Sequence, residues 1–139
     1  MTYKIIGKYI KELNFNIPNP KTFFLLSKDI ANYKINIDIK SKQAKENIIE
    51  ILTSLSLSPI NKEFETIDTK IVYSTIVEIE GNNLSKEEME KIILIQVPTK
   101  IYPELRKIFI FLFENSGFKD VKINETVDFQ NLYKVRKIQ

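Results

Sequence analysis

VPTKIYPELRKIFIFLF, residues 97–113, is the stretch of sequence that says most about the fold. Proline is tolerated in the first turn of a helix, where its missing N–H costs nothing, so Pro98 and Pro103 predict that a helix begins here. Beyond the stretch, Gly117 can take the left-handed conformation of a helix cap, which predicts where the helix ends. A shorter second helix is expected to begin at Val127-Asp128-Phe129.

The main helix carries more apolar side chains than one core-facing stripe needs. Leu105, Phe109, Leu112 and Phe113 have the spacing of such a stripe. Ile108, Ile110 and Phe111 lie partly off it. Either the helix is sandwiched inside a well-filled monomer core, or it has a second apolar face used for oligomerisation. The second interpretation is favoured because a contiguous exposed apolar patch is uncommon on a monomer.

Four segments alternate apolar and polar residues with a period of two, which indicates strands with one buried face. They cover residues 3–17, 33–39, 49–57 and 71–79. In the first segment, Tyr9 has the same parity as Tyr3 and Ile5, so it is expected on the same face. The polar residues 40–47 suit a hairpin connection. Residues 86–94 predict a short helix capped by Asn83 or Ser85.

Strands that come first and helices that come last indicate an α+β fold. We expect a four-stranded antiparallel sheet with two C-terminal helices packed on one face. At 139 residues the chain is expected to form a single domain, residues 1–139. Residues 18–31 connect the first two strands and carry so much apolar surface that they must pack over another element.

Composition excludes most catalytic chemistry. The chain has no cysteine and no histidine, so zinc sites, thiol nucleophiles and imidazole acid–base catalysis are not expected. Three glycines cannot build a phosphate-binding loop. The acidic cluster Glu87, Glu88 and Glu90 could suggest a metal or carboxylate catalysis, but interleaved lysines favour a solvated helix face. We therefore predict no enzyme activity, no catalytic residue, no metal and no cofactor.

Charge and hydropathy limit the partners. Lysine and arginine total 21 against 18 acidic residues, and the resulting net charge of +3 is too small to imply nucleic acid. No apolar run approaches the length of a membrane span, and the N-terminus has no signal-peptide core, so a cytoplasmic location without membrane insertion is expected.

Both ends of the chain resemble the SecB export-chaperone family. The N-terminal segment YIKELNFNIPNP, residues 9–20, is similar to the first strand of the family, which ends in Pro-Asn-Pro. The C-terminal half repeats its closing pattern of proline, arginine and an apolar helix, then Gly-Phe, then Asp-Phe-x-x-Leu-Tyr. The resemblance implies an ATP-independent holdase that binds unfolded or pre-secretory polypeptides and forms a homotetramer as a dimer of dimers.

The resemblance also implies site residues. The expected tetramer interface is Ile108, Ile110 and Phe111, and the expected client groove is Phe23, Phe24, Leu25, Ile101 and Tyr102. A competing interpretation is that Phe23-Phe24-Leu25 merely plugs the core. Docking to the SecA motor would involve Glu12 and the position of Asn16.

Several departures weaken the case for SecA as a partner. Asn16 replaces an acidic residue of the family, the stretch 70–73 has no acidic counterpart, and the chain is basic where typical members are acidic. One alternative is therefore a SecB-like chaperone dedicated to one partner, such as an antitoxin. Another is a small nucleic-acid-binding α+β module that uses exposed aromatic residues.

Overall fold

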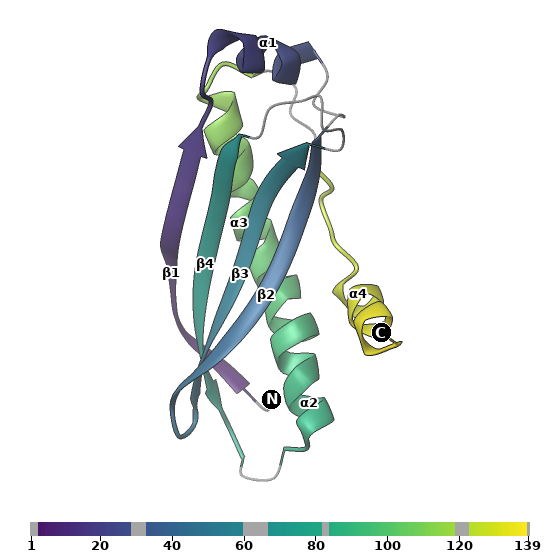
Figure 1. The fold of residues 1–139 in the computed structure, drawn as a ribbon. Coiled ribbons are helices and arrows are strands. Elements are labelled where there is room, and N and C mark those ends of the chain that lie inside the picture. The colour runs from purple at the N-terminus through teal and green to yellow at the C-terminus, as the bar shows by residue number, and fades with distance from the viewer. Residues whose placement is uncertain (1–2, 29–32, 60–66, 82–83, 119–122, 139) are drawn as a thin grey trace.

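The computed structural model describes residues 3–28, 33–59, 67–81, 84–118 and 123–138 (Figure 1). The helices and strands follow one another in this order: β1 (Tyr3–Asn16), α1 (Pro20–Lys28), β2 (Tyr33–Lys45), β3 (Ile48–Pro59), β4 (Asp68–Ile79), α2 (Lys86–Lys91), the π-helical turn η2 (Ile92–Gln96), α3 (Val97–Glu114) and α4 (Phe129–Ile138).

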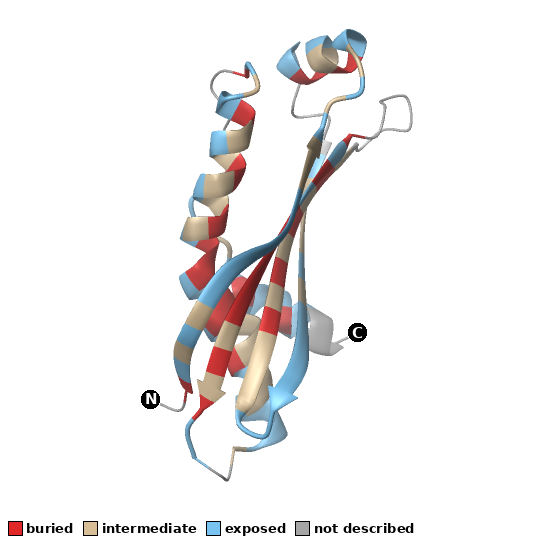
Figure 2. Cartoon of the chain, turned by 90° about the vertical axis from the view of Figure 1, so that its left-hand side faces the viewer, coloured by how far each residue is buried: buried red, intermediate tan, exposed pale blue. Residues whose placement is uncertain are grey.

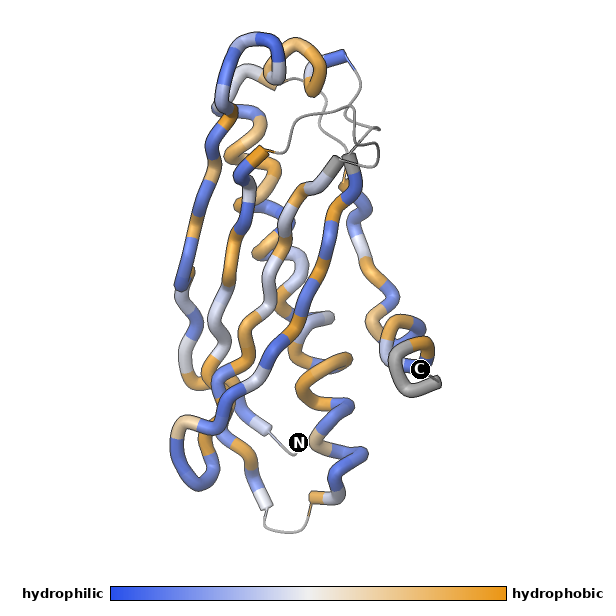
Figure 3. The backbone as a smooth tube through the Cα atoms, viewed as in Figure 1, coloured by the Kyte–Doolittle hydropathy of each residue, from blue (hydrophilic) through white to orange (hydrophobic). Residues whose placement is uncertain are grey.

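The four strands form one antiparallel sheet in the order β1-β4-β3-β2, so β1 and β2 are its edges. The long helix crosses one face of the sheet, and the residues that face it are buried (Figure 2). Apolar and polar residues alternate along the central strands, as the changing colours of the tube show (Figure 3). The predicted fold class, α+β with a four-stranded antiparallel sheet, is confirmed.

The core joins the sheet to the buried side of α3. Leu105, Phe109 and Phe113 are at most 1% exposed. Phe113 meets Phe15 of β1 edge to face, with ring centroids 5.0 Å apart, and lies 5.4 Å from Phe118. Aromatic pairs at this distance add to the stabilisation that comes from burial. The core stripe expected from the sequence is therefore the one that holds the helix on the sheet.

Pro98 stands in the first turn of α3, as predicted, but helical structure already precedes it, and Pro103 lies inside the helix; these two points correct the prediction. α2, η2 and α3 are consecutive, and the helical stretch begins at Lys86, where Ser85 forms a capping box with Glu88. Because Pro98 has no N–H to reach back four residues, the helix contains a π-helical turn just before it, in which the Val97 N–H donates to the carbonyl of Ile92. Pro103 lies inside α3 on its exposed side. The alternative cap Asn83 lies outside the described residues.

Two connections also differ from the prediction. Residues 18–31 contain the helix α1, in which the side chain of Asn19 accepts hydrogen bonds from the backbone and hydroxyl of Thr22, at 2.8 and 3.0 Å. Asn-Pro is a start signal for a helix, and it stands at 19–20. The second difference concerns residues 40–47, which were expected to form a hairpin loop. β2 continues through most of this polar segment and ends at Lys45. An edge strand can be polar because water solvates its free side.

β1 breaks the expected parity at Tyr9. Its pairing with β4 shifts by one residue between Ile5 and Gly7 and again between Ile10 and Glu12. A one-residue shift turns every side chain to the other face. Tyr9 therefore lies on the face away from the helices, opposite Ser74, whereas Tyr3 and Ile5 face the core as predicted.

Candidate functional site

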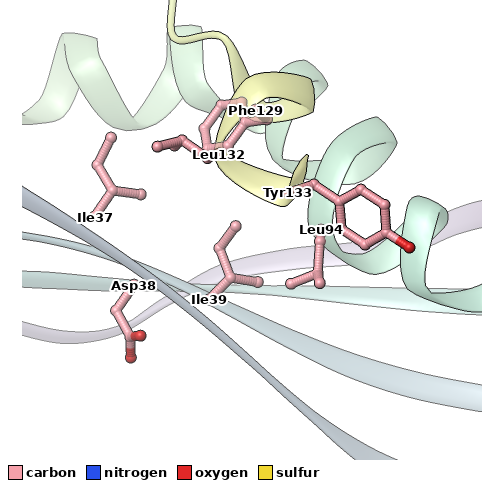
Figure 4. A pocket seen from close by; sticks show the side chains of 7 residues that line it. All are labelled: Ile37, Asp38, Ile39, Leu94, Phe129, Leu132 and Tyr133. Carbon is pink, nitrogen blue, oxygen red and sulfur yellow. The ribbon is translucent and has the colours of Figure 1, made fainter. Parts of the chain in front are cut away.

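An apolar hollow of about 160 Å³ lies between β2, the π-helical turn and α4. Its lining comes from three parts of the chain that are far apart in the sequence: Ile37, Asp38, Ile39, Leu94, Phe129, Leu132 and Tyr133. Figure 4 shows the isoleucine and aromatic side chains converging on the hollow while the carboxylate of Asp38 points away from it. Most of the lining is apolar, so hydrophobic burial is the main contribution that the hollow can make to holding a ligand.

α4 forms one wall of this hollow through Phe129, Leu132 and Tyr133. Phe129 and Tyr133 are 2% and 7% exposed, and the Tyr133 hydroxyl donates to a Glu90 carboxylate oxygen at 3.0 Å. Leu132 and Val135, on the same helix, are about half exposed. The helix therefore adds apolar surface next to the hollow instead of closing it. The sequence prediction did not name these residues, because a hollow between distant segments leaves no local pattern.

α1 presents the aromatic residues expected in the client groove. Phe24 is 63% exposed. Phe23 is half-buried and packs on Phe118, with ring centroids 4.9 Å apart, so it attaches α1 to the segment that follows α3. Leu25 is also half-buried. Figure 1 shows α1 at the upper end of the sheet and α4 beside its lower half, so these two apolar surfaces are separate.

Ile101 and Tyr102 belong to the core of this chain. They are 1% and 3% exposed, and the Tyr102 hydroxyl donates to the carbonyl of Asn124 at 2.6 Å. Burial raises the pKa of Tyr102. The Tyr102 ring lies 6.1 Å from that of Phe129, which lines the hollow. These two residues can therefore support a binding surface from beneath, but their side chains are not exposed on it.

α3 exposes one large apolar residue on its outer side. Phe111 is 62% exposed, while Ile108 and Ile110 are half-buried and pack against the core. β1 exposes more apolar surface than the sequence suggested: Ile6, Tyr9, Ile10 and Leu13 are each between 41% and 46% exposed. An edge strand with this much apolar surface is a candidate for pairing with another chain.

The outer face of the sheet has a second hollow, of about 390 Å³, and its charges are mixed. Leu52, Ser54 and Val72 contribute to its lining, and the other lining residues are charged: Lys11, Glu12, Asp38, Lys40 and Lys70. Of the two residues expected to dock SecA, Glu12 lines this hollow. Three lysines line the same hollow. Asn16 lies at the end of β1, paired with Asp68.

Within the described ranges, no group of three or more histidine, cysteine or acidic residues is placed to hold a metal ion. No helix in the described part of the chain is long and apolar enough to cross a membrane. The large apolar side chains that remain exposed among these residues lie instead on three helices, α1, α3 and α4, and on one sheet edge, β1. These features define a protein-binding α+β domain.

Comparison with known proteins assigns the family. The profile of the SecB family, preprotein translocase subunit SecB, matches residues 1–139. The chain is 42% identical over 134 residues to the SecB protein of Pelagibacter ubique, covering 96% of each. It is 28% identical to protein-export protein SecB of Ehrlichia chaffeensis, covering 94% of this chain and 86% of that protein. The chain belongs to the SecB family of protein-export chaperones, which is not a known enzyme family.

A solved structure confirms the fold. It is the SecB-like chaperone of Mycobacterium tuberculosis in complex with a ChAD peptide from the HigA1 antitoxin, and it superposes with a TM-score of 0.63 at 12% identity. The superposition covers 91% of this chain and 88% of that one. The predicted resemblance to SecB is therefore confirmed by sequence and by fold.

Proposed function

We propose that this chain is an ATP-independent holdase that binds unfolded or pre-secretory polypeptides on exposed apolar surfaces. The observation that carries the proposal is the apolar hollow beside α4, flanked by the half-exposed side chains of Leu132 and Val135. Such a surface accepts many client side chains because it requires no directional partner. Each square ångström of apolar surface that a client buries there contributes roughly 25 cal/mol.

The residues predicted for the client groove are expected to have different roles in client binding: some contact the client, and others support the residues that do. Phe24 and Leu25 form a second apolar contact on α1, and Phe23 holds that helix in place. Ile101 and Tyr102 form the layer beneath. A client that spans both surfaces gains from linking two weak contacts, because the second contact becomes intramolecular once the first has formed.

We further propose that the chain assembles into a homotetramer, as a dimer of dimers. Ile108, Ile110 and Phe111 supply an apolar surface on α3. Both sheet edges carry exposed lysines, which discourage pairing: Lys4, Lys8 and Lys11 on β1, and Lys34, Lys40, Lys42 and Lys45 on β2. β1 differs in that it also carries the exposed apolar residues Ile6, Tyr9, Ile10 and Leu13. β1 is therefore the edge proposed for contact with a second copy.

We also propose delivery to the SecA motor in the cytoplasm, through Glu12 and Asn16. The three lysines around Glu12 reduce the attraction of this surface for a basic partner. They favour a second candidate function, a SecB-like chaperone dedicated to one partner. The peptide from the HigA1 antitoxin bound to the M. tuberculosis chaperone is an example of a single defined ligand on this fold.

Suppression of aggregation tests the client-binding proposal. A chemically unfolded model protein is diluted with the chaperone in the absence of ATP, and light scattering is followed. Leu132→Ser should reduce the suppression, whereas Gln130→Ser, an exposed neighbour on the same helix, should not. Added salt should leave the suppression intact, because hydrophobic contacts persist where binding to nucleic acid collapses. A wild-type protein without effect on scattering would disprove the proposal.

A further inference from the structure

The segment of β1 between its two bulges is turned over relative to the rest of the strand. Gly7–Ile10 pair with Ile76–Tyr73, one residue out of step with the pairing on either side. Lys8 consequently faces the helices and Tyr9 faces away from them. The segment is held by side-chain contacts on both faces of the sheet, and a glutamate is at the centre of each set.

On the helix side, Glu104 of α3 holds the segment. Its carboxylate accepts a hydrogen bond from the Lys8 ammonium at 2.7 Å and another from the Tyr73 hydroxyl at 3.1 Å. The bond from Lys8 is the main reason that the pKa of Glu104 lies below its ordinary value, and it raises the pKa of Lys8 in return. This contact connects the edge strand to the long helix.

On the outer face of the sheet, Glu50 of β3 holds the segment in the same way. One carboxylate oxygen accepts hydrogen bonds from the Tyr9 hydroxyl at 2.6 Å and the Ser74 hydroxyl at 2.7 Å. The other oxygen lies 3.7 Å from the ammonium of Lys11, the extra residue of the second bulge. The bonds from Tyr9 and then Ser74 lower the pKa of Glu50. Glu50 thus connects β1 to β3 across the intervening strand β4.

A different register of the segment keeps both ends of β1 unchanged. If the first bulge moved to the position of the second, residues 3–5 and 12–16 would keep their partners on β4, while Lys8 and Tyr9 would exchange faces. Lys8 would then be removed from Glu104, and Tyr9 from Glu50. The observed register is the one in which both glutamates have their partners.

We propose that Glu50 and Glu104 are positioning residues that hold β1 in its doubly bulged register, and that this register shapes the free edge for a second copy of this chain. The inference rests on the self-association proposed above. Ile6 lies at the first bulge, and Ile10 lies in the turned segment, so the register decides where two of the exposed apolar side chains of this edge point.

A disulfide can trap the register, since the chain has no cysteine of its own. A Cβ atom built at Gly7 lies 3.9 Å from the Cβ of Ile76, inside the range of disulfides. Gly7→Cys with Ile76→Cys should therefore crosslink in the observed register. In the shifted register the two side chains would lie on opposite faces, so the bond could not form.

The test combines this pair with Glu50→Gln and Glu104→Gln. The two glutamine substitutions should shift the equilibrium between the registers by at least about tenfold, given the usual strength of hydrogen bonds to charged groups. Crosslinking should slow in proportion to the fraction of molecules that leaves the observed register. The substitutions should also reduce the oligomer fraction seen by native mass spectrometry at micromolar concentration. Oxidation of the cysteine pair should restore the oligomer. As a matched control, Glu46→Gln with Glu114→Gln removes two exposed carboxylates for which the described residues show no ion pair, and it should change neither measurement.

Each outcome decides a separate question. Unchanged crosslinking in the Glu50→Gln, Glu104→Gln variant would overturn the positioning role. Slower crosslinking without any change of oligomer, or a lost oligomer that oxidation does not restore, would overturn the link between register and assembly. A monomeric wild-type chain would disprove the proposed self-association itself, and the crosslinking rates would still decide whether the two glutamates set the register.

Discussion

Phe111 and Phe24 are a matched pair, because their exposed fractions are 62% and 63% and both lie on helices. We expect Phe111→Ala to weaken assembly and Phe24→Ala to weaken client binding. A phenylalanine side chain presents roughly 200 Å². Burial of the exposed part of Phe111, on the order of 120 Å², contributes up to about 3 kcal/mol per copy, which is about a hundredfold in the dissociation constant.

Sedimentation equilibrium over a dilution series measures the assembly constant, and suppression of aggregation measures client binding at a concentration where the wild type is assembled. At a concentration where the wild type and both variants are monomeric, thermal unfolding should be nearly unchanged, since alanine favours helix and neither side chain is in the core. An assembly constant that Phe111→Ala leaves unchanged, or that both substitutions weaken equally, would refute the assignment of Phe111 to the interface.

Three further predictions concern the fold. Phe113→Ala, which empties a fully buried aromatic site, should lower the free energy of unfolding by about 3–5 kcal/mol in urea denaturation; a loss below about 1 kcal/mol would contradict the packing. Gly117→Ala should destabilise more than Gly81→Ala. Both glycines have φ near +97°, but only at Gly117 would the new Cβ meet a ring, 3.3 Å from Phe23. Because two hydroxyl donors hold the pKa of Glu50 below its ordinary value of 4.5, its stabilisation is present above that pH and is lost as the pH falls through the folded pKa. In the Glu50→Gln variant, the free energy of unfolding should therefore fall less steeply as the pH is lowered. The same pH dependence as in the wild type, measured by urea denaturation below pH 4.5, would argue against this role of Glu50.

Much of the fold could be predicted because local patterns carry it. Alternation of apolar and polar residues identified the four strands, and the spacing of Leu105, Phe109 and Phe113 identified the face of the helix that packs on them. The boundaries were harder to predict. Pro98 and Pro103 indicated a helix start by propensity, but the packing of α3 on the sheet stabilises a helical stretch long enough to contain both.

The candidate site was only partly predictable. Phe24 and Phe111 were named from the sequence, and both prove to be highly exposed. Ile101 and Tyr102 were named with them but are buried, because the side of a helical residue is decided by what packs on it. The hollow beside α4 was not predicted, since its walls come from three segments that meet only in the folded chain.

The sequence by itself determined the α+β class and the membership of the SecB family, since apolar periodicity and the motifs near both ends are local properties of the chain. Only the tertiary structure decided which of the apolar residues remain exposed and which face of the sheet Tyr9 occupies. The reason is physical: two one-residue bulges in β1 reverse the side-chain parity, and they are held by Glu50 and Glu104, which stand far from them in the sequence.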